Sequence, residues 1–358
     1  MDSSNAEIRV LVTGASGFLG IHCTQQLLRE GYKVRGTVRN ISNQLKIEPL
    51  RQLESGEKLE LVEADLESDK GWTDAVKDCT YILHVASPFP TYADESIIKT
   101  AVDGTIRVLR AAAQEASVKK VVLTSSSAAI NEGHDNPERL FNEDDWTNSD
   151  SKSVPNYSKS KTLAERAAWD FVRSDPGVKF QLTVINPTLI VGPLLHNIQG
   201  TSITVIRRFL SNQMPAVPSI ELGMVDVRDV ANAHIKAMRE PKSDGERIIA
   251  TWQPSISFLE IANILRKEFG PQGYYLPRFE VPYPILWLYS FFDREAREIL
   301  VRVGYKIHLD NTKAKRLLGL EFMDPRSSII EMAYDVIERG MAPKRRGYRG
   351  PPSKAGNA

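Results

Sequence analysis

The sequence predicts an α/β fold, a doubly wound parallel sheet followed by a smaller and mostly helical C-terminal lobe. Three observations lead to this prediction. Short apolar runs alternate with longer helical patterns over the first half of the 358 residues. The runs are apolar almost throughout, as strands covered on both faces require. A glycine-rich turn joins the first run to the first helix, an arrangement typical of such sheets.

The elements follow from these patterns in order. Runs rich in Val, Ile and Leu predict strands, while apolar residues repeated every three or four positions predict helices. We expect strands over 8–12, 33–38, 59–62, 81–85, 120–123 and 180–185. Helices are expected over 18–30, about 44–54 and 94–116, with another before the sixth strand. A strand at 224–227 and a helix at 228–238 look like a return to the main sheet, and later helices are expected over 258–269, 294–303 and 327–339.

Composition excludes several classes of protein. Lys and Arg number 46 against 45 Asp and Glu, a net charge of +1 that gives no reason to expect a nucleic-acid partner. Two cysteines argue against a disulfide framework and fit a reducing, cytoplasmic location. No targeting or integral membrane segment is visible. The apolar run 285–292 is expected to be a buried helix or a cavity lining, with a membrane-surface segment as the alternative. No histidine stands at metal-ligand spacing, so no metal site is predicted, and the acidic run 143–145 is expected to be solvated.

The turn after the first strand carries glycines at the spacing GxxGxxG. Gly14 permits a tight turn, Gly17 lets the backbone approach a pyrophosphate, and Gly20 allows close packing of helix on strand. The N-terminus of the following helix offers N–H groups and the positive end of its dipole to an anion. The position of the motif between a strand and a helix predicts dinucleotide binding by a Rossmann-type sheet.

The end of the second strand indicates which dinucleotide is bound. An NAD site usually carries an acid there, on the ribose 2′-hydroxyl, but this chain has Arg39. Arg39 can pair with a 2′-phosphate, and Lys46 is placed to reach the same group, so we expect NADPH or NADP+. Asp65, followed by Leu66 after the third strand, is expected near the adenine, with a simple helix-cap role as the alternative.

Two motifs suggest the chemistry. Tyr157 and Lys161 are four residues apart and therefore neighbours on one helical face. A nearby ammonium lowers the pKa of a phenol towards neutrality. At the end of the fifth strand, the run Thr124–Ser127 offers a serine hydroxyl that can hydrogen-bond a carbonyl oxygen as it gains negative charge.

In this order the motifs resemble the extended short-chain dehydrogenases/reductases, within them the dihydroflavonol reductase-like branch of aldehyde and ketone reductases. The resemblance covers about residues 6–340 and is carried by the segments 12–20, 36–39, 84–88, 123–126, 157–165 and 186–193. It implies that Ser126 is the catalytic serine, beside Tyr157 and Lys161. It also implies that residues 85–87 pass near the nicotinamide ribose, that Pro187 and Leu189 flank the nicotinamide, and that Ser202 lies near the phosphates.

The predicted site residues fall into two sets. Those expected to bind the cofactor are Gly14, Ser16, Gly17, Phe18, Leu19, Gly20, Arg39, Lys46, Asp65, Leu66, Val85, Ala86, Ser87, Thr124, Tyr157, Lys161, Pro187, Leu189 and Ser202. Those expected to contact the substrate, under the helical lobe, are Ser87, Pro88, Phe89, Tyr92, Ser126, Asn131 and Tyr157.

These residues lead to an expected NADPH-dependent reduction of an aldehyde, ketone or dihydroflavonol-like carbonyl. A hydroxysteroid dehydrogenase/isomerase or sugar-nucleotide epimerase of the same fold is one alternative, and a non-catalytic NADP(H)-sensing protein is another. We expect a cofactor domain over 6–188 plus 224–252 and a substrate lobe over 189–223 plus 253–340. A basic tail over 341–358 is expected to be disordered. The partner is a small carbonyl compound, and no oligomeric state is predicted.

Overall fold

The computed structural model describes residues 5–88, 94–292, 297, 299–300 and 302–352. The chain forms two compact units, each assembled from three separate segments. The first unit comprises Met1–Thr188, Val227–Thr251 and Leu309–Phe322. The second comprises Leu189–Asp226, Trp252–His308 and Met323–Ala358.

The first unit is built on a seven-stranded parallel sheet, which confirms the predicted fold class. Its strand order is β11-β7-β5-β4-β1-β2-β3. The chain therefore reverses direction across the sheet between β1 and β4, the switch point at which such sheets bind ligands. The strands are β1 (Arg9–Thr13), β2 (Lys33–Val38), β3 (Glu60–Glu63), β4 (Tyr81–His84), β5 (Lys120–Thr124), β7 (Gln181–Pro187) and β11 (Arg247–Ala250).

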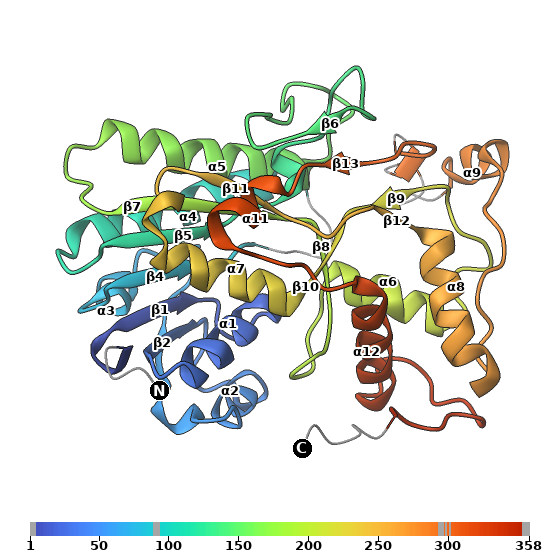
Figure 1. Ribbon diagram of the computed structural model, residues 1–358, viewed down its shortest axis with the longest axis horizontal. Helices are drawn as coiled ribbons and strands as arrows, with labels where there is room; N and C mark the ends of the chain where they lie inside the picture. Colours follow the sequence, from blue (N-terminus) through green and yellow to red (C-terminus); the bar gives the residue numbers. More distant parts are fainter. Residues whose placement is uncertain (1–4, 89–93, 293–296, 298, 301, 353–358) are drawn as a thin grey trace. The chain divides into compact units, whose positions relative to one another are not determined.

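Helices cover both faces of this sheet (Figure 1). On one face α1 packs against α7, and on the other α4 packs against α3 and α5. Buried apolar side chains of β4, β5 and β7 meet Val108 and Trp169 from the helices α4 and α5 to form a core. The helices are α1 (Phe18–Arg29), α2 (Gln44–Arg51), α3 (Trp72–Val76), α4 (Ser96–Gln114), α5 (Asn156–Ser174), α7 (Val227–Arg239) and α11 (Thr312–Leu318), with short turns η1 (Asn5–Glu7), η2 (Gly56–Lys58), η3 (Ser127–Ala129) and η4 (Pro241–Ser243).

The parallel register brings the carboxyl ends of the central strands to one edge. Thr13 is paired with His84, and Thr124 is paired with Ile185. His84 is in turn paired with Leu123. The loops that follow β1, β4, β5 and β7 therefore begin side by side, and these loops carry most of the predicted site residues.

The second unit holds two small two-stranded sheets and four helices within its described residues. Strand β8 (Leu189–Val191) pairs with β10 (Met224–Asp226), and β9 (Glu221–Leu222) pairs with β12 (Ile256–Ser257). Helix α12 (Pro325–Glu338) packs against both α6 (Thr201–Leu210) and α8 (Phe258–Phe269). The remaining elements are η5 (Gly270–Gln272) and α9 (Tyr283–Tyr289). The helix expected over 294–303 falls largely outside the described residues.

Two sequence predictions about the strands need correction. The run 224–227 does not join the main sheet, because β10 pairs with β8 instead. The seventh strand of the sheet is β11, which the sequence analysis missed. It is only four residues long, and its place depends on pairing with β7, a segment distant in sequence.

The expected division of the chain also changes. Residues 309–322, assigned by sequence to the substrate lobe, belong to the first unit, where α11 packs on α7 and β11.

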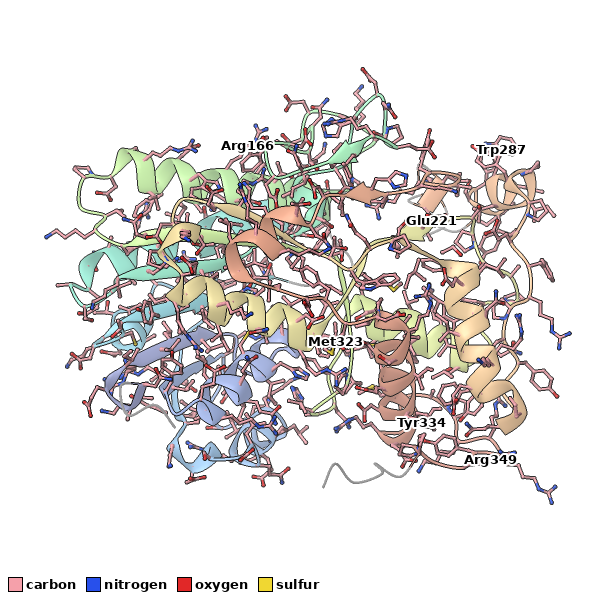
Figure 2. All side chains as sticks on the ribbon, viewed as in Figure 1. Arg166, Glu221, Trp287, Met323, Tyr334 and Arg349 are labelled. Carbon is pink, nitrogen blue, oxygen red and sulfur yellow. The ribbon has the colours of Figure 1, made fainter. Side chains whose placement is uncertain are left out.

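The tail is ordered over 341–352 rather than disordered. The hydroxyl group of Tyr274 donates to the carbonyl of Pro343 at 2.9 Å, and the N–H of Arg349 donates to Gln272 at 3.1 Å. Arg349 and Tyr334, whose hydroxyl accepts from the same glutamine, are labelled in Figure 2.

The apolar run 285–292 differs from its prediction as well. Helix α9 buries Leu286, but Trp287 is 49% exposed and Phe292 is 85% exposed. Figure 2 labels Trp287 on this helix. The run is therefore a largely exposed helix and turn rather than a buried element. The model contains no helix, among the residues described, that is both long enough and apolar enough to cross a membrane.

Candidate active site

The glycine turn after β1 is closely packed. Gly14 has a φ of +65°, and a Cβ there would lie 3.0 Å from the Cα of Ala86. A Cβ at Gly20 would lie 2.2 Å from the carbonyl oxygen of Gly14, which leaves no room for a side chain. The backbone of the turn is fixed by Thr37, whose hydroxyl accepts from the N–H of Gly14 at 3.0 Å.

The first turn of α1 is suited to an anion. Its N-cap residue, Gly17, has no side chain to accept hydrogen bonds from the first N–H groups. Those groups lack acceptors within the helix and lie at the positive end of its dipole. The turn from Ser16 to Gly20 can therefore hold a pyrophosphate, as the sequence predicts.

Two cations lie beyond the end of β2. Arg39 is exposed directly after the strand, and Lys46 is half-buried on α2. Burial and the neighbouring charge of Arg39 both lower the pKa of Lys46. Two cations past the end of β2 are what binding of one phosphate group requires.

The loop after β3 gives Asp65 a structural role. Its carboxylate accepts from the N–H of Glu67 at 3.0 Å, which forms a local turn. Its carbonyl accepts from the indole N–H of Trp72, also at 3.0 Å. Leu66 packs against α4, where a Cβ at Gly104 would come within 2.9 Å of its side chain. Asp65 therefore forms a local turn rather than the expected helix cap, since the N-cap of the next helix α3 is Gly71, and contact with the adenine stays a prediction.

The loop after β4 is tied to the glycine turn. The hydroxyl of Thr13 accepts from the N–H of Ala86 at 3.0 Å and lies 2.8 Å from Nδ1 of His84. Burial, together with the charge of Lys161, lowers the pKa of His84 to about 3, so this ring is neutral near pH 7. The segment 85–87 therefore begins beside the turn that is suited to phosphates.

The serines at the end of β5 have distinct surroundings. Ser125 donates its hydroxyl to the carboxylate of Glu165 at 2.5 Å. Ser126 is the N-cap of η3, and its hydroxyl oxygen accepts from the N–H of Ala128 at 3.1 Å. Accepting this bond leaves the Ser126 proton able to point to a ligand. The hydroxyl of Thr124 lies 2.6 Å from Nε2 of His234, towards the other face of the sheet.

Helix α5 presents the Tyr/Lys pair beside this turn, because α5 packs against η3. Tyr157 is half-buried in its first turn. Lys161 is 8% exposed, one turn further along. Burial lowers the pKa of Lys161 to about 8, and the charge of Glu165 opposes this shift.

A pocket in the first unit collects residues from several of these segments. Its walls include Ala86, Ser87, Pro88, Ser125, Lys161 and Glu165. Five residues predicted separately from sequence therefore line one hollow: Ala86, Ser87 and Pro88 after β4, Thr124 at the end of β5, and Lys161 on α5. Pro187, another predicted residue, ends β7 at the same edge of the sheet.

The other predicted residues do not line this pocket, and among them are the predicted catalytic residues Ser126 and Tyr157. Asn131 follows η3 and donates its N–H to the carbonyl of Ser127 at 3.2 Å. Leu189 and Ser202 belong to the second unit. Phe89 and Tyr92 lie outside the described residues. No group of His, Cys, Asp or Glu side chains within the described part of the chain could hold a metal ion.

Sequence reasoning missed two residues of this region, Glu165 and Arg247. They form a buried ion pair at 2.5 Å, with side chains that are 0% and 9% exposed. The spacing of Tyr157, Lys161 and Glu165, four residues apart each time, was the available signal, because it places all three on one helical face. Nothing local marked Arg247, which starts a strand distant from them in sequence.

The acidic run is also only partly solvated. Glu143 is 6% exposed, and its carboxylate accepts from the N–H of Ile249 at 3.0 Å. Burial raises its pKa, although that hydrogen bond opposes the shift. The prediction of a solvated surface is wrong for Glu143, because pairing with β11 buries it.

Comparison with known proteins identifies similar chains. Residues 10–250 match the model of the NAD dependent epimerase/dehydratase family. The chain is 36% identical over 352 residues to a cinnamoyl-CoA reductase from Medicago truncatula, covering 96% of this chain and 99% of that one. It is 32% identical over 334 residues to a bifunctional dihydroflavonol 4-reductase/flavanone 4-reductase from Pyrus communis, covering 87% and 92%. The crystal structure of yeast methylglyoxal/isovaleraldehyde reductase complexed with NADPH matches with a TM-score of 0.76 and 28% identity, covering 93% and 99%.

Proposed function

The chain belongs to the NAD dependent epimerase/dehydratase family, and we propose that it reduces the carbonyl group of an aldehyde or ketone to an alcohol with NADPH. Its relatives confirm the resemblance to the dihydroflavonol reductase-like branch. The observation that supports the reaction most strongly is the arrangement of Ser126, Tyr157 and Lys161. The serine has an available hydroxyl proton, and the other two lie on the adjoining helix.

The cofactor is NADPH, and the first unit has features that fit it. The uncapped N-terminus of α1 and the turn without side chains at Gly14 and Gly20 suit a pyrophosphate. Arg39 and Lys46 would hold the 2′-phosphate, since they are neighbouring cations past the end of β2. When bound, this cofactor supplies the hydride that reduces the carbonyl carbon.

The side chains of the site have separate tasks in the reaction. Ser126 donates its hydroxyl proton in a hydrogen bond to the carbonyl oxygen and stabilises the charge that develops there. Tyr157 transfers its phenolic proton to the same oxygen, which yields the alcohol. Lys161 stabilises the tyrosinate left behind and would hold the ribose hydroxyls of the cofactor.

The substrate is a small carbonyl compound, and the location we propose is the cytoplasm. Both cysteines, Cys23 and Cys79, are free and buried, which fits a reducing compartment. Burial raises the pKa of both thiols, so neither is poised to act as a nucleophile.

The test follows NADPH absorbance as the purified protein meets a panel of α-dicarbonyls, aromatic aldehydes, dihydroflavonols and steroid ketones. We expect oxidation of NADPH with at least one class and formation of the matching alcohol. Sugar nucleotides complete the panel. Conversion of a sugar nucleotide without net NADPH oxidation would replace the proposal with an epimerase, and NADPH binding without turnover of any compound would replace it with a sensing protein.

A further inference from the structure

The carboxylate of Glu165 is the best-connected buried acid near the proposed site. Its side chain is 0% exposed. One oxygen accepts from Arg247 at 2.5 Å and from the indole N–H of Trp169 at 3.5 Å. The other accepts from Ser125 at 2.5 Å and from the amide of Asn186 at 2.8 Å. A buried charge of this kind is stable only because every lone pair meets a donor.

These donors connect Glu165 to the proposed catalytic serine. Ser125 directly precedes Ser126 at the end of β5. The amide nitrogen of Asn186, which donates to Glu165, also donates to the carbonyl of Ser126 at 3.1 Å. The carboxylate of Glu165 thus holds the side chain of Ser125. Asn186, which donates to that carboxylate, holds the backbone of Ser126. The position of the Ser126 hydroxyl depends on that anchorage.

Glu165 also has a cation on each side. Lys161 lies one turn earlier on α5, and both residues line the same pocket. On the other side, Arg247 donates to the carbonyls of Glu143 and Asp145 at 2.7 and 2.6 Å. Its guanidinium lies 3.7 Å from the ring centre of Trp146. Arg247 is therefore held in place by the loop, and its charge is paired with the carboxylate of Glu165.

Apart from Glu165, the described residues that line the pocket with Lys161 have no acidic or basic side chain. His84 on β4 is neutral because burial lowers its pKa. The wall of the pocket that α4 contributes is made of Ala101 and Thr105. The electrostatic environment of Lys161 is therefore set mainly by Glu165 and, through it, by Arg247.

We propose that Glu165 is a positioning residue for the carbonyl reduction, which anchors the Ser125–Ser126 segment and divides its negative charge between Lys161 and Arg247. This inference rests on the proposed function, since it concerns the same site. It predicts that removing the charge of Glu165 and removing the charge of Arg247 shift the pKa of Lys161 in opposite directions. Loss of the carboxylate charge removes a stabiliser of the lysine ammonium, whereas loss of the arginine charge leaves the carboxylate to act on the lysine alone.

The test compares Glu165→Gln, Arg247→Gln and the double variant with the wild type. The first readout is the titration of Lys161, followed by NMR of ε-¹³C-lysine in the protein without substrate and assigned with Lys161→Arg. We expect its pKa to fall by about one pH unit in Glu165→Gln and to rise by a smaller amount in Arg247→Gln. The pKa of Lys161 in the double variant should lie between its values in the two single variants. The second readout is the alkaline limb of kcat with saturating NADPH, which should move in the same directions.

Either single variant leaves an unpaired group in the interior and can fail to fold, but the double variant removes both charges and avoids that cost. If only the double variant folds, its Lys161 pKa should lie below that of the wild type, because the direct partner Glu165 has the larger effect. Glu143→Gln is the matched control, since it neutralises a buried carboxylate on the far side of Arg247, and it should leave the titration of Lys161 unchanged.

The proposal would be overturned if Lys161 had the same pKa in the wild type and in the folded Glu165 variants. It would also be overturned if the pKa of Lys161 shifted in the same direction in both single variants. If the proposed carbonyl reduction is wrong, the outcome differs from a failure of this inference. In that case the wild type reduces no carbonyl compound, while the titration of Lys161, measured without substrate, still reports whether Glu165 controls it.

Discussion

Ser125 and Ser126 are adjacent in sequence, but their hydroxyl groups face different partners. Ser125 donates to the buried carboxylate of Glu165 at 2.5 Å, whereas the oxygen of Ser126 accepts from the N–H of Ala128 at 3.1 Å. The first hydroxyl thus has its proton committed to the interior. The second keeps its proton for a ligand. The two serines should therefore fail in different ways when they are replaced.

We expect Ser126→Ala to lower kcat for carbonyl reduction by about 10²- to 10³-fold, because it removes a donor to the developing oxyanion. Its free energy of unfolding should fall by only about 1 kcal/mol, the cost of losing a cap. Ser125→Ala should instead cost about 1–3 kcal/mol, since it leaves a buried carboxylate short of a donor. Urea unfolding and steady-state kinetics measure both quantities. If Ser125→Ala lost more kcat than Ser126→Ala, the catalytic role would belong to Ser125 and not to Ser126.

Arg39→Ala should weaken NADPH far more than NADH. The lost charge-assisted hydrogen bonds to the 2′-phosphate are worth about 1.5–3 kcal/mol, or roughly 10- to 100-fold in Kd. NADH lacks this phosphate, so its Kd should change little. Calorimetric titration of both cofactors makes the comparison. Arg29→Ala is the control, because that arginine pairs with Glu54 on the surface. Equal losses for the two cofactors would refute the phosphate assignment.

Gly20→Ala should disrupt the turn that is suited to phosphates. Its new Cβ would lie 2.2 Å from the carbonyl oxygen of Gly14, so the backbone must move. We expect about 3 kcal/mol of destabilisation and at least tenfold weaker NADPH binding. Gly200→Ala is the matched control, since its Cβ would meet only the end of Ile203 at 3.5 Å. Thermal unfolding and NADPH titration should separate the two variants, and similar behaviour would show that the close packing at Gly20 is not required.

Two of the buried histidines, His84 and His234, should make the protein sensitive to acid. Burial lowers the pKa of His84 to about 3 and that of His234 to about 4, from about 6.5 in the unfolded chain. Below pH 6.5 the unfolded state therefore binds protons that the folded state does not. Each histidine then contributes about 1.4 kcal/mol of lost stability per pH unit, down to its folded pKa.

Urea unfolding between pH 7 and pH 5 measures this loss. The slope of stability against pH should become markedly shallower in His234→Asn, because one of the two histidines is removed. His308→Asn, at an exposed position, should leave the slope unchanged. An unchanged slope in His234→Asn would contradict the buried neutral state of that ring.

The features that sequence predicted are those with local signals. The strands β1, β2, β3, β4, β5 and β7 are apolar runs, and the turn at Gly14–Gly20 is marked by its glycine spacing. Tyr157 and Lys161 are marked by helical spacing on one face. Each of these signals lies within a few residues of the element that it predicts, so tertiary contacts were not needed to read them.

The features that sequence missed depend on contacts between distant segments. Arg247 and Glu165 are 82 residues apart, and Glu143 meets the backbone of β11 across 106 residues. A charged residue at the start of a four-residue strand looks solvated until its partner is known. The same holds for the strand predicted at 224–227. Its own residues predict a strand, but they do not show that it pairs with β8 instead of the main sheet.

The central claim is that Tyr157 supplies the proton in an NADPH-dependent carbonyl reduction, and the most direct measurement is kcat for Tyr157→Phe together with its Kd for NADPH. Tyr81→Phe, at the start of β4, controls for loss of a phenol elsewhere in the sheet. We expect kcat to fall by about 10²- to 10⁴-fold in Tyr157→Phe, with an NADPH Kd close to that of the wild type. Retention of most of the wild-type kcat would contradict the account.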